Sequence, residues 1–85
     1  MIENLEIVIG QRGFVWVGNV DRSTDRIVIT NAQNIRRWGT TWGLGQLAIE
    51  GPQPNTRLDK CGIVTLHFSA EIAAIKCDPE KWKNN

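Results

Sequence analysis

The chain has 85 residues, enough for one small domain but not for two, because domains rarely have fewer than about 50 residues. Ten Lys and Arg against nine Asp and Glu give a formal net charge of +1, which argues against a protein that binds nucleic acid or membrane surfaces mainly through charge. The start is acidic where a signal peptide is basic, and no apolar run reaches the roughly 18 residues of a membrane span, so we expect a cytoplasmic protein. Small cores are commonly completed by oligomerisation, and we expect a homo-oligomer.

The first part of the sequence predicts a three-stranded antiparallel meander. Residues 5–9 and 14–20 are rich in β-branched and aromatic residues and flank a glycine-bounded turn, which is typical of a hairpin. Gly18 gives the second strand a place to bend. A third run, residues 26–30, follows a polar turn and completes the meander.

The periodicity changes after residue 31. Residues 34–38 and 44–49 each predict a short helical segment, and a spacer of Gly, Thr and Trp separates them. A Gly-Pro pair directly follows the second segment, as is typical of a helix end.

The last part of the sequence returns to strands. Residues 63–68 alternate between the two faces, and residues 71–76 follow with little turn chemistry, so we expect a sharp bend in the two residues between them. Asp78 and Pro79 are typical of a helix start, and we expect the short helix to pack Trp82 onto the core.

These elements predict a mainly β fold. We expect a small five-stranded barrel or a bent antiparallel sheet, with a short Trp/Gly-rich helical insertion and a short C-terminal helix. The chain is interpreted as one small domain that spans residues 1–85. Its segments are a β-meander (1–31), an Arg/Trp/Gly-rich insertion (32–54), the last strands (55–77) and the terminal helix (78–85).

The insertion carries the residue types that a nucleotide site requires. Guanidinium groups bind phosphate through paired charge-assisted hydrogen bonds, a helix N-terminus offers N–H groups to an anion, and an indole face stacks on a base. Residues of these types are the candidate ligand-binding residues: Arg36, Arg37, Trp38, Trp42, Gly43 and Arg57. The tryptophans also suit a core or an interface. Arg57 and Lys60 could supply further positive charge to a pocket, but they and the other arginines also suit a solvated surface. Both interpretations stay open at this point.

Groups suited to catalysis are few. His67 is the only imidazole and has no Ser, Cys or Asp at a motif spacing, so we expect a structural role for it. The charges of the 21–26 turn, Arg22 among them, are expected to be solvated. Cys61 and Cys77 are too few for a zinc site, even with His67, and are expected to be packed free thiols. We therefore expect no enzymatic activity, no metal and no cofactor.

Residues 12–35 resemble the opening strands of a Sm-like or SH3-like barrel. They read Arg-Gly-Phe-Val-Trp-Val-Gly-Asn-Val and then Arg-Ile-Val-Ile-Thr-Asn-Ala, a glycine-containing bent strand before a strand that ends in Asn-Ala. The resemblance implies a ring-forming small barrel that often binds RNA. No Sm-type RNA-binding motif is evident near the C-terminus, which argues against a nucleic-acid partner.

A second resemblance covers most of the chain. Residues 31–51 read Asn-Ala-Gln-Asn-Ile-Arg-Arg-Trp, a spacer, and Leu-Gly-Gln-Leu-Ala-Ile-Glu-Gly, and residues 65–82 run from a strand through Cys-Asp-Pro-Glu into a short helix. This pattern is similar to a family of small phage and prophage proteins, and more distantly resembles the Thoeris anti-defence sponge proteins. That likeness implies Arg36, Arg37, Trp38 and Trp42 as phosphate and base contacts.

The resemblance also implies a function. The protein would be an oligomer that sequesters a cyclic nucleotide or cyclic ADP-ribose type immune signal without cleaving it, in the cytoplasm of an infected bacterium. One alternative is a structural or protein-interaction module of a phage, because Trp and Arg are also enriched at protein interfaces. Another is a Sm-like nucleic-acid-binding barrel, whose affinity would fall steeply with salt.

Overall fold

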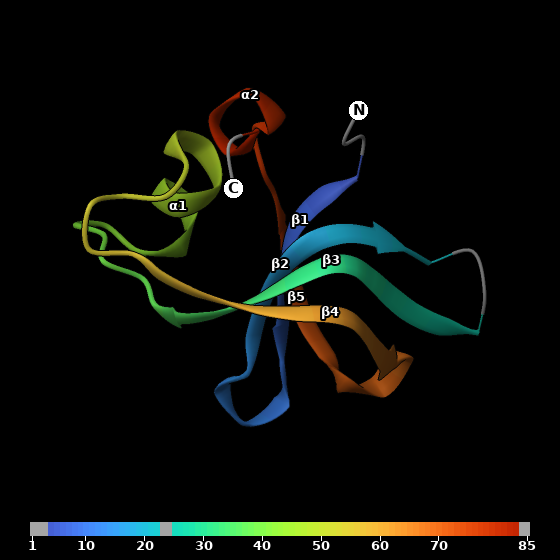
Figure 1. Ribbon diagram of the computed structural model, residues 1–85. Coiled ribbons are helices and arrows are strands. Elements are labelled where there is room, and N and C mark those ends of the chain that lie inside the picture. Colours follow the sequence, from blue (N-terminus) through green and yellow to red (C-terminus); the bar gives the residue numbers. More distant parts are fainter. Residues whose placement is uncertain (1–3, 23–24, 84–85) are drawn as a thin grey trace.

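The computed structural model describes residues 4–22 and 25–83, which form one five-stranded antiparallel sheet with two short helices (Figure 1). The strands are β1 (Leu5–Gly10), β2 (Val15–Asp21), β3 (Arg26–Arg37), β4 (Arg57–His67) and β5 (Glu71–Lys76). The helices are α1 (Leu44–Glu50) and α2 (Pro79–Trp82), and two 3-10 turns, η1 (Gln11–Gly13) and η2 (Phe68–Ala70), join β1 to β2 and β4 to β5. The predicted mainly β fold is confirmed. None of the described helices is long and apolar enough to cross a bilayer.

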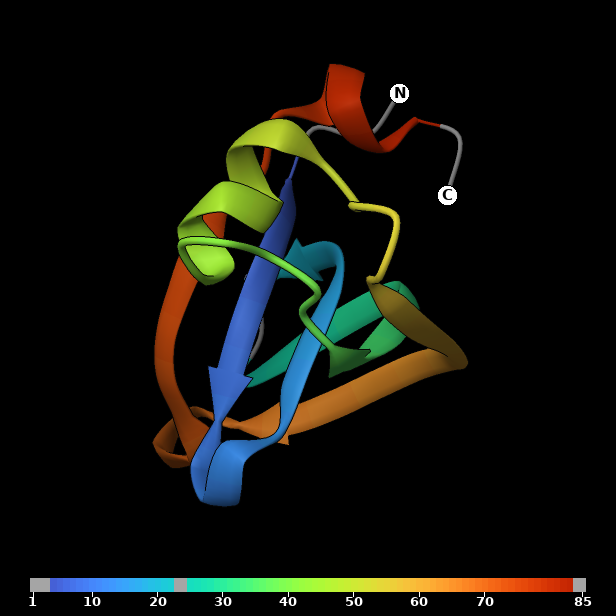
Figure 2. The ribbon, with the colours of Figure 1, turned by 90° about the vertical axis from the view of Figure 1, so that its left-hand side faces the viewer.

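The strands follow the order β4-β3-β2-β1-β5 across the sheet. β1 therefore lies between β2 and β5, and Ile7 on β1 is opposite Val17 on one side and Ile75 on the other. The two ends of this order, β4 and β5, are the edge strands of the described sheet, and the sheet curls strongly between them (Figure 2).

The bend of the second strand occurs at Gly18, as the sequence predicts. The register between β2 and β3 shifts between Val17 and Asn19. A Cβ atom at Gly18 would lie 2.5 Å from Cγ2 of Ile29 and 2.9 Å from the carbonyl oxygen of Thr30, so only glycine permits this close approach of β2 to β3.

The helical segment predicted for residues 34–38 is wrong, because β3 continues to Arg37. The side chain of Asn34 donates to the carbonyl oxygen of Val15 at 3.2 Å, and Ile35 is buried opposite Leu58. β4 accordingly begins at Arg57, six residues before the predicted strand start. Pairing between β3 and β4 thus overrides the local pattern, as tertiary contacts commonly do for weak propensities.

Both helices pack over the same end of the sheet (Figures 1 and 2). The predicted start of α2 is confirmed, since the carboxylate of Asp78 accepts from the Glu80 N–H at 3.1 Å. Trp82 is 2% exposed, and its indole Nε1–H donates to the carbonyl oxygen of Ala48 at 3.4 Å. Leu44, Leu47 and Ala48 of α1 join it in a core with the first three strands. A second apolar cluster, built from the other face of the sheet, holds Val8, Val20, Ile27, Ile29 and Ala32.

Arg22 is exposed, as expected, but it also forms ion pairs that the sequence did not predict. Its guanidinium forms ion pairs with Glu6 at 3.0 Å and with Glu71 at 2.6 Å. Glu6 is buried, so its charge needs this partner. The turn after β2 is thereby attached to β1 and to β5.

Candidate functional site

The ends of β3 and β4 bring two of the predicted arginines together. Arg37 and Arg57 are directly opposite each other in the register between these strands, and both are exposed. Among the described residues, no carboxylate forms an ion pair with either guanidinium. Arg57 is anchored through its Nη1, which donates to the carbonyl oxygens of Thr56 at 3.1 Å and Pro54 at 3.4 Å. We call these two residues the arginine pair.

Trp38 directly follows Arg37, the first member of the arginine pair, in the chain. Its side chain is 44% exposed, and its carbonyl oxygen accepts a hydrogen bond from the Thr56 hydroxyl at 2.7 Å. Gly39 has a φ of 65° and lies so close to the backbone of residues 55–56 that a Cβ atom would overlap it. The two loops are therefore fixed against each other, and they hold the backbone of an exposed tryptophan directly after Arg37.

The structure gives the third predicted arginine a partner. Nε of Arg36 donates to the Asp59 carboxylate at 2.9 Å, and both side chains are largely exposed. Exposed ion pairs of this kind contribute about 0 to 1 kcal/mol and compete weakly with a ligand. Arg36 is nevertheless the less available cation at this end of the sheet.

Trp42 and Gly43 lie at the other end of the same loop, where α1 begins. Trp42 is 56% exposed, and its ring lies beside Gly45. The backbone N–H groups of Thr41 and Trp42 both donate to Oε1 of Gln46, at 2.8 and 3.0 Å. These two donors are thus already bound, and α1 is only seven residues long. The structure therefore pairs Arg37 with Arg57, and Trp38 follows Arg37 in the chain, whereas Trp42 and Gly43 lie at the start of α1.

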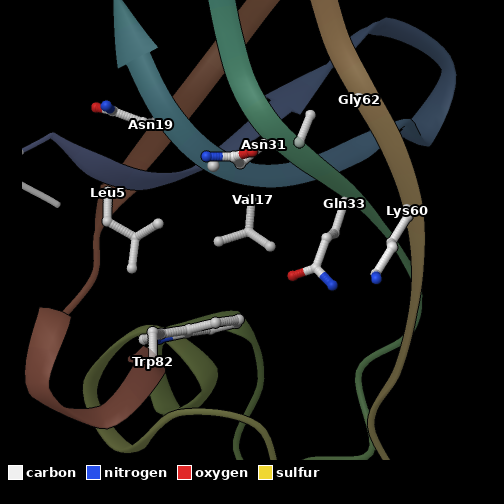
Figure 3. A pocket seen from close by; sticks show the side chains of 10 residues that line it. Leu5, Val17, Asn19, Asn31, Gln33, Lys60, Gly62 and Trp82 are labelled. Atoms are coloured by element: carbon white, nitrogen blue, oxygen red, sulfur yellow. The ribbon is translucent and has the colours of Figure 1, made fainter. Parts of the chain in front are cut away.

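Sequence reasoning missed a cleft of about 640 Å³ between the face of the sheet and α2 (Figure 3). Its apolar lining includes Leu5, Val17 and Trp82, and its polar lining consists of Asn19, Asn31, Gln33 and Lys60. Val17, Gln33 and Lys60 are register partners on three adjacent strands, so they form one row across the sheet. Figure 3 shows the amide of Gln33 and the amine of Lys60 pointing into the same space.

The sequence contained part of the signal for this cleft. Lys60 was a candidate for charge in a pocket, and Asn31 has the left-handed backbone that asparagine tolerates, with a φ of 50°. Gln33 could not be placed opposite Lys60, because a helical insertion was predicted to begin at residue 32.

The cysteines and the histidine lie outside both sites. Nδ1 of His67 accepts the Ser69 N–H at 3.2 Å and caps η2, which agrees with the expected structural role. Both thiols are free, but Cys61 is exposed, so the expectation of packing holds only for Cys77. Burial, and then the charge of Glu6, raise the pKa of the Cys77 thiol to about 12.

Neither the scan against protein-family models nor the search of curated proteins found a match to this chain. The predicted phage and sponge resemblance therefore stays a prediction.

Proposed function

We propose that this protein is a non-catalytic binder that sequesters a phosphate-bearing, nucleotide-derived ligand at Arg37, Arg57 and Trp38. The arginine pair carries the proposal. Like charges directly opposite each other on adjacent strands are destabilising, and no described carboxylate offsets these two. A phosphate held between the two guanidiniums removes that repulsion and accepts charge-assisted hydrogen bonds from both.

Trp38 supplies the second requirement of a nucleotide site. Trp38 is 44% exposed and directly follows Arg37 in the chain, on a backbone that Thr56 and Gly39 hold in place. Stacking of a base on an aromatic ring contributes roughly 1 to 3 kcal/mol, measured by alanine substitution. Arginine and indole together recognise the two chemically distinct parts of a nucleotide.

Binding alone requires no acid, base or nucleophile. The residues that support the proposal are cations and an indole, which position a ligand but do not transfer protons at neutral pH. The resemblance to Thoeris sponge proteins suggests which ligands to test first: cyclic nucleotides and cyclic ADP-ribose type immune signals. In this proposal the protein is a phage anti-defence sponge that acts in the cytoplasm of an infected bacterium, as a homo-oligomer.

The direct test is a depletion and release experiment. Purified protein is incubated with cyclic mononucleotides, cyclic dinucleotides and cyclic ADP-ribose isomers, and the free ligand is measured after filtration, before and after heat denaturation. We expect one ligand to be depleted and then recovered intact. Recovery as a cleavage product would show an enzyme, and no depletion at tens of micromolar protein would contradict the proposal.

A pair of matched variants assigns the site. Arg37→Gln with Arg57→Gln removes two positive charges at the proposed site, and we expect at least a tenfold loss of affinity. Lys81→Gln with Lys83→Gln removes the same charge from α2 and from the residue after it, where both lysines are exposed, and serves as the control. Equal losses in both variants would mean that net charge, not the arginine pair, governs binding.

The edges of the sheet favour a protein-interaction module as the second candidate. Ile63 on β4 and Ile72 on β5 are 70% and 66% exposed, and both lie on edge strands. Edge strands with exposed apolar side chains readily pair with another chain. A stable complex with a partner protein, together with no ligand depletion, would favour this function.

A further inference from the structure

We propose that the cleft between the sheet and α2 is a second binding site, which takes a nucleoside monophosphate. The residues that line this cleft lie on a different part of the sheet from the arginine pair. None of the six residues predicted for ligand binding is among them. The inference therefore does not depend on the proposed function. Its volume of about 640 Å³ lies within the usual range of small-molecule sites.

The polar side chains of the cleft have no hydrogen-bond or ion-pair partner among residues 4–22 and 25–83. Lys60 has no ion pair with a described residue, and the amide groups of Asn19, Asn31 and Gln33 form no hydrogen bond with the described part of the chain. Polar side chains in folded proteins are usually bonded to backbone, to side chains or to water. Four such groups around one cavity are available to a ligand.

The composition of the lining selects the class of ligand. A carboxamide presents a donor and an acceptor side by side and pairs with the edge of a base that presents the complementary couple. No acidic side chain is among the described lining residues, and the single cation, Lys60, matches one phosphate group.

The floor of the cleft argues against a carbohydrate as the occupant. Trp82 is only 2% exposed and Val17 only 1%, so the indole offers no open face for a sugar ring. A base is instead recognised at its edge by the row that Gln33 and Lys60 form on adjacent strands. We infer that Gln33 contacts the base and that Lys60 contacts the phosphate.

The test is a titration of the ¹⁵N-labelled protein with the four common ribonucleoside 5′-monophosphates, followed by NMR. The side-chain amide signal of Gln33 and the indole signal of Trp82 report the cleft, whereas the indole signal of Trp38 reports the arginine pair. We expect at least one monophosphate to shift the Gln33 and Trp82 signals at millimolar concentration. The matching uncharged nucleoside should bind about tenfold more weakly, because it cannot engage Lys60.

Two variants complete the test. Lys60→Gln should reduce the affinity for the monophosphate to that for the nucleoside, and Gln33→Ala should weaken both ligands about tenfold. Lys76→Gln is the control, because Lys76 is exposed on β5 and does not line the cleft, and it should leave the shifts of the Gln33 and Trp82 signals unchanged. Lack of any shift with all four monophosphates would overturn the inference, as would shifts confined to the Trp38 signal.

Discussion

The guanidinium of Arg22 donates two hydrogen bonds to the carboxylate of Glu6, at 3.1 Å from Nη1 and 3.0 Å from Nη2. It also donates to the carboxylate of Glu71 at 2.6 Å. These hydrogen bonds, that to Glu71 most of all, raise the pKa of Arg22 above its already high ordinary value. One side chain after β2 thus connects β1 to β5, the strand that borders the sheet on this side.

We expect Arg22→Ala to lower the free energy of unfolding by about 2 kcal/mol, because it leaves the buried Glu6 carboxylate without its partner. Urea denaturation monitored by tryptophan fluorescence measures the change. Glu80→Gln is the control, since it removes the ion pair between Glu80 and Lys83. These two side chains are 77% and 67% exposed, respectively. The control should cost less than about 0.5 kcal/mol. Equal effects would mean that the Arg22 contacts are no stronger than a surface pair.

Two glycine-to-alanine substitutions should change stability in opposite directions. Gly18→Ala places a methyl group 2.9 Å from the carbonyl oxygen of Thr30, on a backbone that cannot move without opening the β2–β3 pairing. We expect a loss of at least about 2 kcal/mol. Gly45→Ala lies in α1 with only the ring of Trp42 nearby, at 3.9 Å, and should stabilise the protein by about 0.5 to 1 kcal/mol. A stable Gly18→Ala variant would show that the sheet tolerates a different bend.

Local sequence patterns predicted part of the fold. The strands, the bend at Gly18, α1 and the capped start of α2 follow from patterns within ten or fewer residues, and all are present. The extension of β3 to Arg37 does not, because it depends on the pairing of Ile35 with Leu58, more than 20 positions away. The ion pairs of Arg22 were not predicted for the same reason, since its partners Glu6 and Glu71 lie far from it along the chain.

The candidate site was predictable in part. Residue chemistry alone pointed to Arg37, Trp38 and Arg57, and the strand register brings the two arginines together. The cleft could not be predicted from the sequence, because amide side chains have no sequence signature of a binding site. They are recognised as a lining only once the register of three strands places Val17, Gln33 and Lys60 in one row.

The two cysteines should differ sharply in reactivity. Cys61 is exposed and should react with a thiol reagent at neutral pH, whereas Cys77 is buried and should react only after unfolding. The pKa of the Cys77 thiol is raised to about 12 from an ordinary value of 9.0, so between these pH values the unfolded chain loses this proton and the folded chain keeps it. Stability should therefore fall as the pH rises above about 9.

Thermal unfolding between pH 8 and 11 measures this dependence, with Cys77→Ala as the comparison. The variant should be less stable at pH 8, because it leaves a small cavity, but its stability should decline less steeply with pH. The same slope in both proteins would mean that other groups, such as the lysines, cause the alkaline loss.

The last prediction concerns the edge strands. In the proposed homo-oligomer, exposed edges that carry Ile63 and Ile72 are the surfaces best suited to join a second copy, because their backbone groups face outward beside apolar side chains. Ile63→Lys puts a charge on the β4 edge, and we expect it to shift the sedimentation coefficient toward that of the monomer. The side chain is 70% exposed, so stability of the fold should change by less than about 0.5 kcal/mol.

Ile49→Lys is the matched control, since Ile49 is 57% exposed but lies on α1 rather than on an edge strand. It adds the same charge and should leave the assembly intact. Dissociation by Ile49→Lys alone would place the contact at α1 rather than at the sheet edges. A wild-type protein that sediments as a monomer at all concentrations would contradict the homo-oligomer, and the arginine pair would then have to bind its ligand within one chain.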